Sequence, residues 1–400
     1  MRIGANMKRS RAVFLVVGLG LLLTVQGVST SLLLIPDGAR IQWPEPESRH
    51  GLDFTASGDA WASPGPWAIS SLQVEARPSG SPEATPLGFP AERPVIVYGR
   101  RSPYALPTWT ARVALPAAGD WTLRIAARTT DGRRIESAGR RLLASSALAG
   151  VEDSGFSSWS APHLFAIGAV ILGAFAVAYF ARRGGASWLD AAAPYIAFAM
   201  WANELAYQSY WMIVGGWSHS VSLMLQMCGL SIVFIPVCLF MRDSPRRRHL
   251  ADVLYFWGLG GAAQAILTPD IGASSFPSYR YFSFFLSHGL IIIAVIALVS
   301  SGSVKIGLRS LARCVLISNV VIVPVYLVDR LLALVPPYAP GNYFALGYPP
   351  PTGSPIDFLV KIFGPSPRYF AGLEIMGVLV FTLLWLPWGL SAKSRKKLVA

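Results

Sequence analysis

Length, composition and charge indicate a membrane protein. The 400 residues are 53% hydrophobic and 14% charged, and the mean hydropathy of +0.47 is too high for a soluble protein. The formal net charge of +13 would suggest nucleic acid as the partner of a soluble protein. Here most basic residues lie in short loops beside apolar segments or in a polar N-terminal region, so we expect no nucleic-acid partner.

Residues 1–30 are predicted to form a signal peptide or a signal-anchor helix. Basic residues at positions 2, 8, 9 and 11 precede an apolar run from Ala12 to about Val28. The apolar core is short and small residues follow it, a pattern that fits a cleaved signal peptide and an uncleaved anchor equally. In both cases the basic end stays in the cytoplasm and the residues that follow are exported.

Residues 31–158 are predicted to form an extracytoplasmic β-sandwich of immunoglobulin-like type. Apolar and small or polar residues alternate from Trp109 to Leu115 and from Trp121 to Ala127, which is typical of strands with one buried face. Asp131-Gly132 is a hairpin signal. Many short strands with turn signals between them favour a sandwich. We expect an interaction or spacer domain, which leaves open a protein partner for it.

Residues 159–400 are predicted to form a bundle of seven transmembrane helices, because apolar runs of about 20 residues recur there. The expected spans are about 161–181, 190–214, 219–241, 250–267, 281–301, 312–335 and 368–391. Basic clusters occur only in every second connection and at the C-terminus, while the opposite loops are poor in charge. This predicts a multi-pass protein of the inner or plasma membrane, with the β-domain outside and the C-terminus in the cytoplasm.

Several polar residues are expected at a similar depth in the outer half of the bilayer. At ~1.5 Å per helical residue, Cys228, His288 and Glu204 all fall in this half, together with Gln226 and Gln264. Buried polar groups in a membrane find their partners inside the bundle. The sequence therefore predicts a polar cavity that opens towards the outer leaflet.

Each of these residues also has an ordinary structural explanation. Cys228 would serve as a small packing residue, His288 would hydrogen-bond a neighbouring carbonyl, and Glu204 would be a protonated structural residue. His163, His219 and His288 contain no pair at the helical spacing of metal ligands, so we expect no metal and no other cofactor. All three cysteines lie in predicted spans, which argues against a disulfide framework.

The stretch from about Phe156 to Leu390 resembles the YwaF family of integral membrane proteins. The residues that carry the resemblance are His163, Glu204, Leu225 to Cys228, Gly258 to Gly261, Gln264, Leu267 to Asp270, Phe276-Pro277, Phe285 to Gly289, Asn342-Tyr343, Pro350, Gly364-Pro365 and Leu386-Pro387. The resemblance does not extend to the β-domain.

The resemblance implies a catalytic cysteine and histidine. An animal member of that family is a transmembrane acyltransferase that puts polyunsaturated acyl chains onto lyso ether phosphatidylethanolamine. Its cysteine in the third span and the histidine of its Ser-His-Gly unit correspond to Cys228 and His288. The histidine that the family often has two residues before the cysteine is Gln226 here, which argues against a second imidazole in the mechanism. The residues expected to support the pair are Glu204, Gln226, Gln264, Asp270 and Asn342.

These observations lead to one leading hypothesis and two alternatives. The leading one is a lipid acyltransferase in which Cys228 is the nucleophile and His288 the base, moving an acyl chain from a membrane phospholipid to a lysolipid through a thioester. The first alternative is a lipid hydrolase, in which water resolves the same thioester. The second is a non-catalytic membrane sensor or assembly protein.

Overall fold

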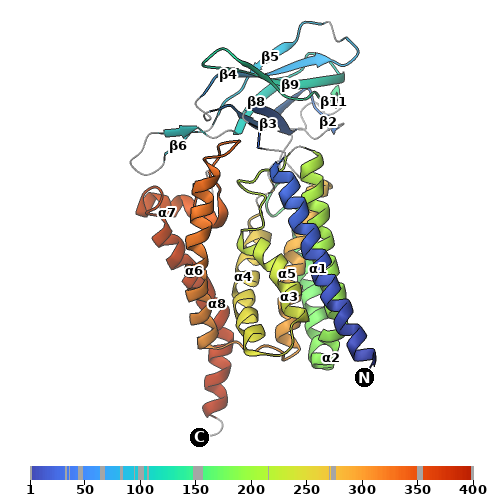
Figure 1. Ribbon diagram of the computed structural model, residues 1–400, viewed down its shortest axis with the longest axis vertical. Helices are drawn as coiled ribbons and strands as arrows, with labels where there is room; N and C mark the ends of the chain where they lie inside the picture. The colour runs from blue at the N-terminus through green and yellow to red at the C-terminus, as the bar shows by residue number, and fades with distance from the viewer. Residues whose placement is uncertain are drawn as a thin grey trace.

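The computed structural model describes residues 2–31, 34–35, 37–43, 48–63, 68–81, 84–93, 95–97, 103–105, 108–146, 156–214, 216–269, 271, 276–348 and 355–397. Strands occupy the N-terminal part and helices the C-terminal part (Figure 1). The strands gather at one end of the helices, and both chain termini lie at the opposite end. The sequence prediction of a β region ahead of a helical part is confirmed.

The β region consists of sheets whose inward-facing side chains share one core. The strands are β1 (Gly38–Trp43), β2 (Ser48–His50), β3 (Asp53–Trp61), β4 (Ile69–Pro78), β5 (Leu87–Pro90), β6 (Val95–Val97), β7 (Pro103–Ala105), β8 (Thr108–Ala114), β9 (Gly119–Thr129), β10 (Arg134–Glu136) and β11 (Arg140–Ala144). One sheet has the order β1-β3-β8 and a second the order β2-β11-β9-β4-β5, with β10 beside β9. A two-stranded sheet pairs β6 with β7.

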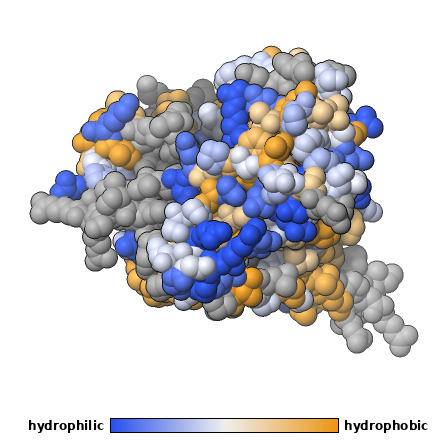
Figure 2. Space-filling view, turned by 90° about the horizontal axis from the view of Figure 1, so that it is seen from above, coloured by the Kyte–Doolittle hydropathy of each residue, from blue (hydrophilic) through white to orange (hydrophobic). Residues whose placement is uncertain are grey.

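Period-two alternation decides which residues fill this core. Along β9 the buried positions are Trp121, Leu123, Ile125, Ala127 and Thr129, with partly buried or exposed residues between them. The buried face of β8 contributes to the same cluster, so side chains from both larger sheets meet. The exposed end of the molecule carries broad hydrophilic patches beside hydrophobic ones (Figure 2). The immunoglobulin-like type of the sandwich stays a prediction.

The helical part contains long apolar helices suited to a membrane. Its elements are α2 (Ala161–Ile213), α3 (Met227–Phe240), α4 (Pro245–Leu267), α5 (Tyr279–Ser300), α6 (Leu308–Leu332), α7 (Pro355–Phe363) and α8 (Phe370–Lys397). Within the described residues, six helices are long and apolar enough to cross a bilayer, counting α1 (Arg2–Ser31). The multi-pass character of the protein is confirmed, and the number of seven spans stays a prediction.

Helix α2 folds back on itself at Gly185. This residue has φ of 58° and ψ of −142°, a conformation that glycine adopts without a Cβ clash. The carbonyl of Pro162 accepts a hydrogen bond from the Tyr281 hydroxyl, and at the other end the rings of Tyr210 and Tyr279 lie 4.6 Å apart. Both ends of this 53-residue helix therefore meet the first turn of α5, and its two halves run antiparallel.

Helix α3 is shorter than the sequence predicted. A span over 219–241 was expected, but α3 begins at Met227 and has 14 residues. The preceding residues form an irregular segment, in which His219 and Ser220 are buried. The hydroxyl of Tyr343 donates to the carbonyl of His219 over 2.6 Å, and the backbone amide of Asn342 donates to the carbonyl of Ser220 over 2.9 Å. Non-helical backbone at this place is satisfied by protein contacts instead of by helical hydrogen bonds.

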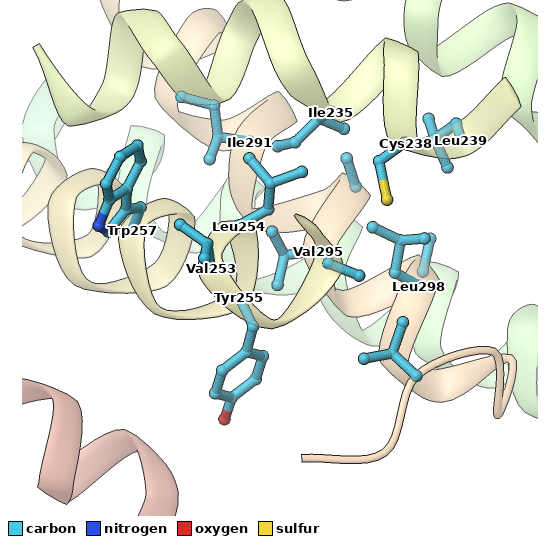
Figure 3. Close-up of a cluster of buried hydrophobic side chains, with 14 of the residues drawn as sticks. Ile235, Cys238, Leu239, Val253, Leu254, Tyr255, Trp257, Ile291, Val295 and Leu298 are labelled. Carbon is cyan, nitrogen blue, oxygen red and sulfur yellow. The ribbon is translucent and has the colours of Figure 1, made fainter. Parts of the chain in front are cut away.

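The centre of the bundle is a packed layer between α3, α4 and α5. Ile235, Leu254 and Ile291 come from these three helices and point toward one another (Figure 3). Cys238 lies in the same cluster and is fully buried. This thiol therefore serves as a packing residue.

Helix α1 packs along the bundle. The ring of Phe14 stacks on Trp201 of α2 at 5.4 Å between centroids, and Gly18 lies directly against the same indole. Leu22 is 1% exposed. The close approach at Gly18 shows that this segment fits the surface of α2.

The β region is tied to one end of the helical part by arginines and tryptophans. Arg40 pairs with Asp59 and donates a hydrogen bond to the carbonyl of Trp217. Arg140 donates to the carbonyl of Val214 over 2.8 Å. Trp61 and Trp217 pack in one small cluster, and each is 2% exposed. The β region is thus seated on the segment that connects α2 and α3.

Candidate functional site

Cys228 lies in the first turn of α3, directly against α4. It is the second helical residue after the N-cap Gln226. A methyl group at Gly261 of α4 would lie 3.1 Å from the Cys228 sulfur, so the thiol occupies the space that this glycine leaves. The thiol is half-buried.

His288 is held in one tautomer by its own helix. Its Nδ1 lies 2.8 Å from the carbonyl oxygen of Phe284. Because a carbonyl only accepts, Nδ1 of the neutral ring must carry the proton, and Nε2 is then a proton acceptor. In the described part of the chain, Nε2 has no hydrogen-bond partner. The imidazole therefore has the tautomer that a general base needs.

The helical spacing directs His288 towards α4. It precedes Ile291 by three residues and Val295 by seven, so the three share one face of α5. Ile291 and Val295 pack against Gly258 of α4, where a methyl group would lie 3.1 Å and 2.9 Å from them. Gly258 and Gly261, which contacts Cys228, are three residues apart on α4. The thiol thus contacts α4 one turn away from the place where Ile291 and Val295 of α5 contact it, and among the described residues no hydrogen bond joins Cys228 and His288.

Glu204 belongs to a different polar group. Its Oε1 accepts a hydrogen bond of 2.7 Å from Gln208 one turn further along α2. Gln208 in turn accepts from the indole N–H of Trp217 over 2.7 Å. Glu204 and Gln208 are both buried. In the described chain Glu204 makes no hydrogen bond to His288, so this structure does not give it the role of orienting the imidazole.

Gln226 and Asn342 clamp the loop that covers the start of α3. The Gln226 amide donates to the carbonyl of Asn342 over 3.0 Å and accepts from the amide of Phe344 over 2.9 Å. The Asn342 side chain accepts from the amide of Tyr348 over 3.0 Å. Gln226 thus holds backbone on both sides of its amide.

A cavity of about 620 Å³ lies beside Met227, between α3, α4, α6 and α8. Its walls are largely apolar, with Phe370 and Phe381 among them, and its polar lining side chains are Gln226, Gln264, Ser318, Asn319, Asn342 and Glu374. Three of the predicted supporting residues, Gln226, Gln264 and Asn342, are therefore brought together. Cys228 and His288 do not line the cavity, although Met227 precedes the thiol. The predicted supporting residue Asp270 lies outside the described residues.

Asn319 and Ser318 are cavity residues that the sequence reasoning missed. Asn319 donates to the Glu374 carboxylate over 2.8 Å, and Ser318 accepts from the indole N–H of Trp257 over 2.8 Å. An asparagine in the middle of an apolar span is a signal that would have identified the first of them.

Two other histidines are buried for different reasons. His163 accepts from the amide of Trp159 over 2.8 Å and lies 2.7 Å from the carbonyl of Ile266, so both ring nitrogens are satisfied. Both ring nitrogens of His219 are buried and find no hydrogen-bond partner in the part of the chain that the structure describes. Burial, together with the nearby Arg40, lowers the pKa of His219 to about 4. Within the described residues, no group of three His, Cys, Asp or Glu side chains is arranged to hold a metal ion.

The comparison with known families identifies the helical part. Residues 156–385 match the model of the TMEM164 family. The match begins just ahead of α2 and ends within α8, so it leaves out the β region. No curated protein matches the chain. The name YwaF, given above from sequence motifs, stays a prediction.

Proposed function

Because the chain belongs to the TMEM164 family of transmembrane proteins, we propose that it transfers acyl chains between membrane lipids with Cys228 and His288. The observation that carries this proposal is the hydrogen bond of 2.8 Å from His288 Nδ1 to the carbonyl of Phe284. It leaves Nε2 as an acceptor on α5, the helix whose Ile291 and Val295 pack against α4, and the thiol packs against α4 as well.

The proposed reaction has two half-reactions. In the first, Nε2 of His288 takes the proton of the Cys228 thiol, and the thiolate attacks the ester carbonyl of a phospholipid. A thioester forms, the ester C–O bond breaks, and the lysolipid alkoxide takes the proton from the imidazolium. In the second, the hydroxyl of an acceptor lysolipid gives its proton to Nε2 and attacks the thioester, which restores the thiol.

Substrate binding must bring the thiol and the imidazole closer than they are without a ligand. Catalytic hydrogen bonds often form only in the substrate complex. The cavity beside Met227 adjoins the start of α3 and has largely apolar walls, which suit a lipid chain. We propose that the β region faces the outside and the C-terminus the cytoplasm, with the basic clusters on the inner side.

The test is turnover by purified protein in lipid nanodiscs. A phospholipid with a labelled acyl chain is supplied with and without lysolipid, and labelled product is measured. We expect acceptor-dependent transfer that Cys228→Ala abolishes, while His288→Asn lowers the rate by about 10²–10⁴-fold. Cys238→Ala is the matched control, since this thiol lies in the packed layer, and it should keep the rate.

The same assay separates the alternatives. Release of labelled fatty acid that does not need lysolipid, and that depends on Cys228, would indicate the hydrolase. Transfer that persists in Cys228→Ala would refute the proposed nucleophile. A protein that shows no turnover, and whose Cys228 is not labelled by a thiol-reactive acyl probe, would favour the non-catalytic sensor or assembly protein. The observation that favours this alternative is that no hydrogen bond joins Cys228 and His288 among the described residues.

A further inference from the structure

The charge of the cavity beside Met227 is negative and uncompensated. Glu374 is the only ionisable residue in the described lining, which contains no Lys, Arg or His. No ion pair of the described residues involves this carboxylate. Since a charged group inside a membrane protein is costly, it usually serves a binding or transport function.

Asn319 holds the Glu374 carboxylate in place without neutralising it. The Nδ2 group of Asn319 donates to the carbonyl of Val315 over 3.0 Å and to Oε1 of Glu374 over 2.8 Å. Both of its N–H groups are then used, one within α6 and one on α8. Oε2 of Glu374 has no partner among the described residues, and the side chain is only partly buried. This oxygen is available to accept a hydrogen bond from a ligand.

The other polar side chains in the lining of the cavity are neutral. Gln264 of α4 is exposed, and its amide forms no hydrogen bond within the described chain. The Ser318 oxygen accepts from the indole N–H of Trp257 and also lies 3.9 Å from the Cys314 sulfur, so Ser318 is a neutral, already partnered polar group of the lining. Together with Glu374 these groups offer both donors and acceptors to a hydroxyl group. A phosphate, in contrast, would face a carboxylate with no cation beside it, and like charges in a water-poor site repel strongly.

We propose that this cavity binds the free hydroxyl end of a neutral glycerolipid and that Glu374 excludes anionic headgroups from it. The volume of about 620 Å³ accommodates a glycerol unit and the start of its chain between Phe370 and Phe381. This inference is separate from the proposed acyl transfer, because the acceptor there is a lysolipid and the lipid bound here carries no phosphate. The binding selectivity itself does not require turnover.

The experiment measures binding with two photoreactive probes that differ only in the headgroup. Diacylglycerol and phosphatidic acid carrying the same diazirine-labelled chain are added separately to the Cys228→Ala protein in nanodiscs of zwitterionic lipid. Labelled peptides are then identified by mass spectrometry. We expect the diacylglycerol probe to label cavity-lining residues of α6 and α8 at least ~10-fold more than the phosphatidic acid probe, a ratio that corresponds to about 1.4 kcal/mol.

The variant Glu374→Gln, made in the same background, tests the cause of the selectivity. Its amide oxygen still accepts from Asn319, so the shape of the cavity is kept while the charge is lost. We expect labelling by phosphatidic acid to rise to the level of diacylglycerol. Asp243→Asn is the matched control, because it removes a carboxylate from the exposed connection between α3 and α4, and it should keep the selectivity.

Equal labelling by both probes in the parent protein, or unchanged selectivity in Glu374→Gln, would overturn this inference. Neither result depends on catalysis, because the protein carries no Cys228 thiol. Conversely, a protein that labels selectively but shows no acyl transfer in the turnover assay would refute the proposed function and leave the selectivity of the cavity standing.

Discussion

Lowering the pH should weaken the contact between the β region and the segment that connects α2 and α3, because His219 in that segment becomes protonated when the contact opens. This histidine is fully buried in the connection between α2 and α3, and both ring nitrogens lack a partner. The charged groups that act on it are Arg40 and Asp59 of the β region, and its pKa is lowered from 6.5 to about 4 by burial first and by Arg40 second. The structure therefore favours the neutral ring.

The sign and size of the effect follow from these two pKa values. When the β region leaves its seat, His219 meets water and regains a pKa near 6.5. Above pH 6.5 the ring is neutral in both states and the seat has its full stability. As the pH falls towards 4, only the exposed ring binds a proton, so the seated state loses stability. A difference of about 2.5 pKa units corresponds to about 3 kcal/mol.

The assay is thermal unfolding of the purified protein, followed by tryptophan fluorescence at pH values from 8 to 4. His219→Gln removes the titrating ring, and we expect it to flatten the loss of stability between pH 6.5 and 4. His249→Gln is the control, since His249 is exposed near the start of α4, and it should keep the loss. An acid-induced loss of the same size in His219→Gln would show that other groups cause it and that the reasoning is wrong.

Three further predictions concern the packing described above. Arg40→Ala leaves the buried Asp59 carboxylate without its cation and should destabilise the protein by about 3 kcal/mol. Arg112→Ala removes an exposed pair and should cost much less, and chemical denaturation compares the two variants. Gly18→Leu should release α1 from the bundle, because its Cβ would lie 2.1 Å from the Trp201 ring, and protease protection of an N-terminal tag would report the release. Gly261→Val should displace the Cys228 sulfur, which lies 3.1 Å from a Cβ at that position. We expect this variant to abolish acyl transfer while its melting temperature falls only slightly. Unchanged transfer would contradict the placement of the thiol.

Local sequence patterns predicted the structure correctly where each face of a strand or helix meets a single environment, either the protein core, water or lipid. Alternation along β8 and β9 predicted the buried faces correctly, because a strand in a sheet shows one face to the core. The length of the apolar runs likewise predicted the positions of α4, α5, α6 and α8 to within a few residues, because a helix that crosses a bilayer needs about 20 apolar residues.

Long-range partners explain where the predictions failed. The residues before Met227 are apolar enough for a helix, but their backbone bonds to Asn342 and Tyr343, more than a hundred positions away. The supporting role expected of Glu204 stays a prediction, and a partner that was not anticipated is Gln208, which donates to its carboxylate from one turn along the same helix. Which polar residue reaches the Glu204 carboxylate depends on how the helix is rotated about its axis. The spacing of apolar residues does not define this rotation, because the helix is apolar on all sides.

The arrangement of the candidate site depends on the absence of side chains from one face of α4. Gly258 admits Ile291 and Val295 of α5, so the helix that carries His288 approaches closely. Gly261 admits the sulfur of Cys228, and Gly260 lies between them at the wall of the cavity. Since side chains at 258 and 261 would push α5 and α3 outward, the same three glycines set the separation of thiol and imidazole and the width of the adjoining cavity. Catalysis and lipid selectivity would then depend on the packing of a single helix, and a substitution there should change both together.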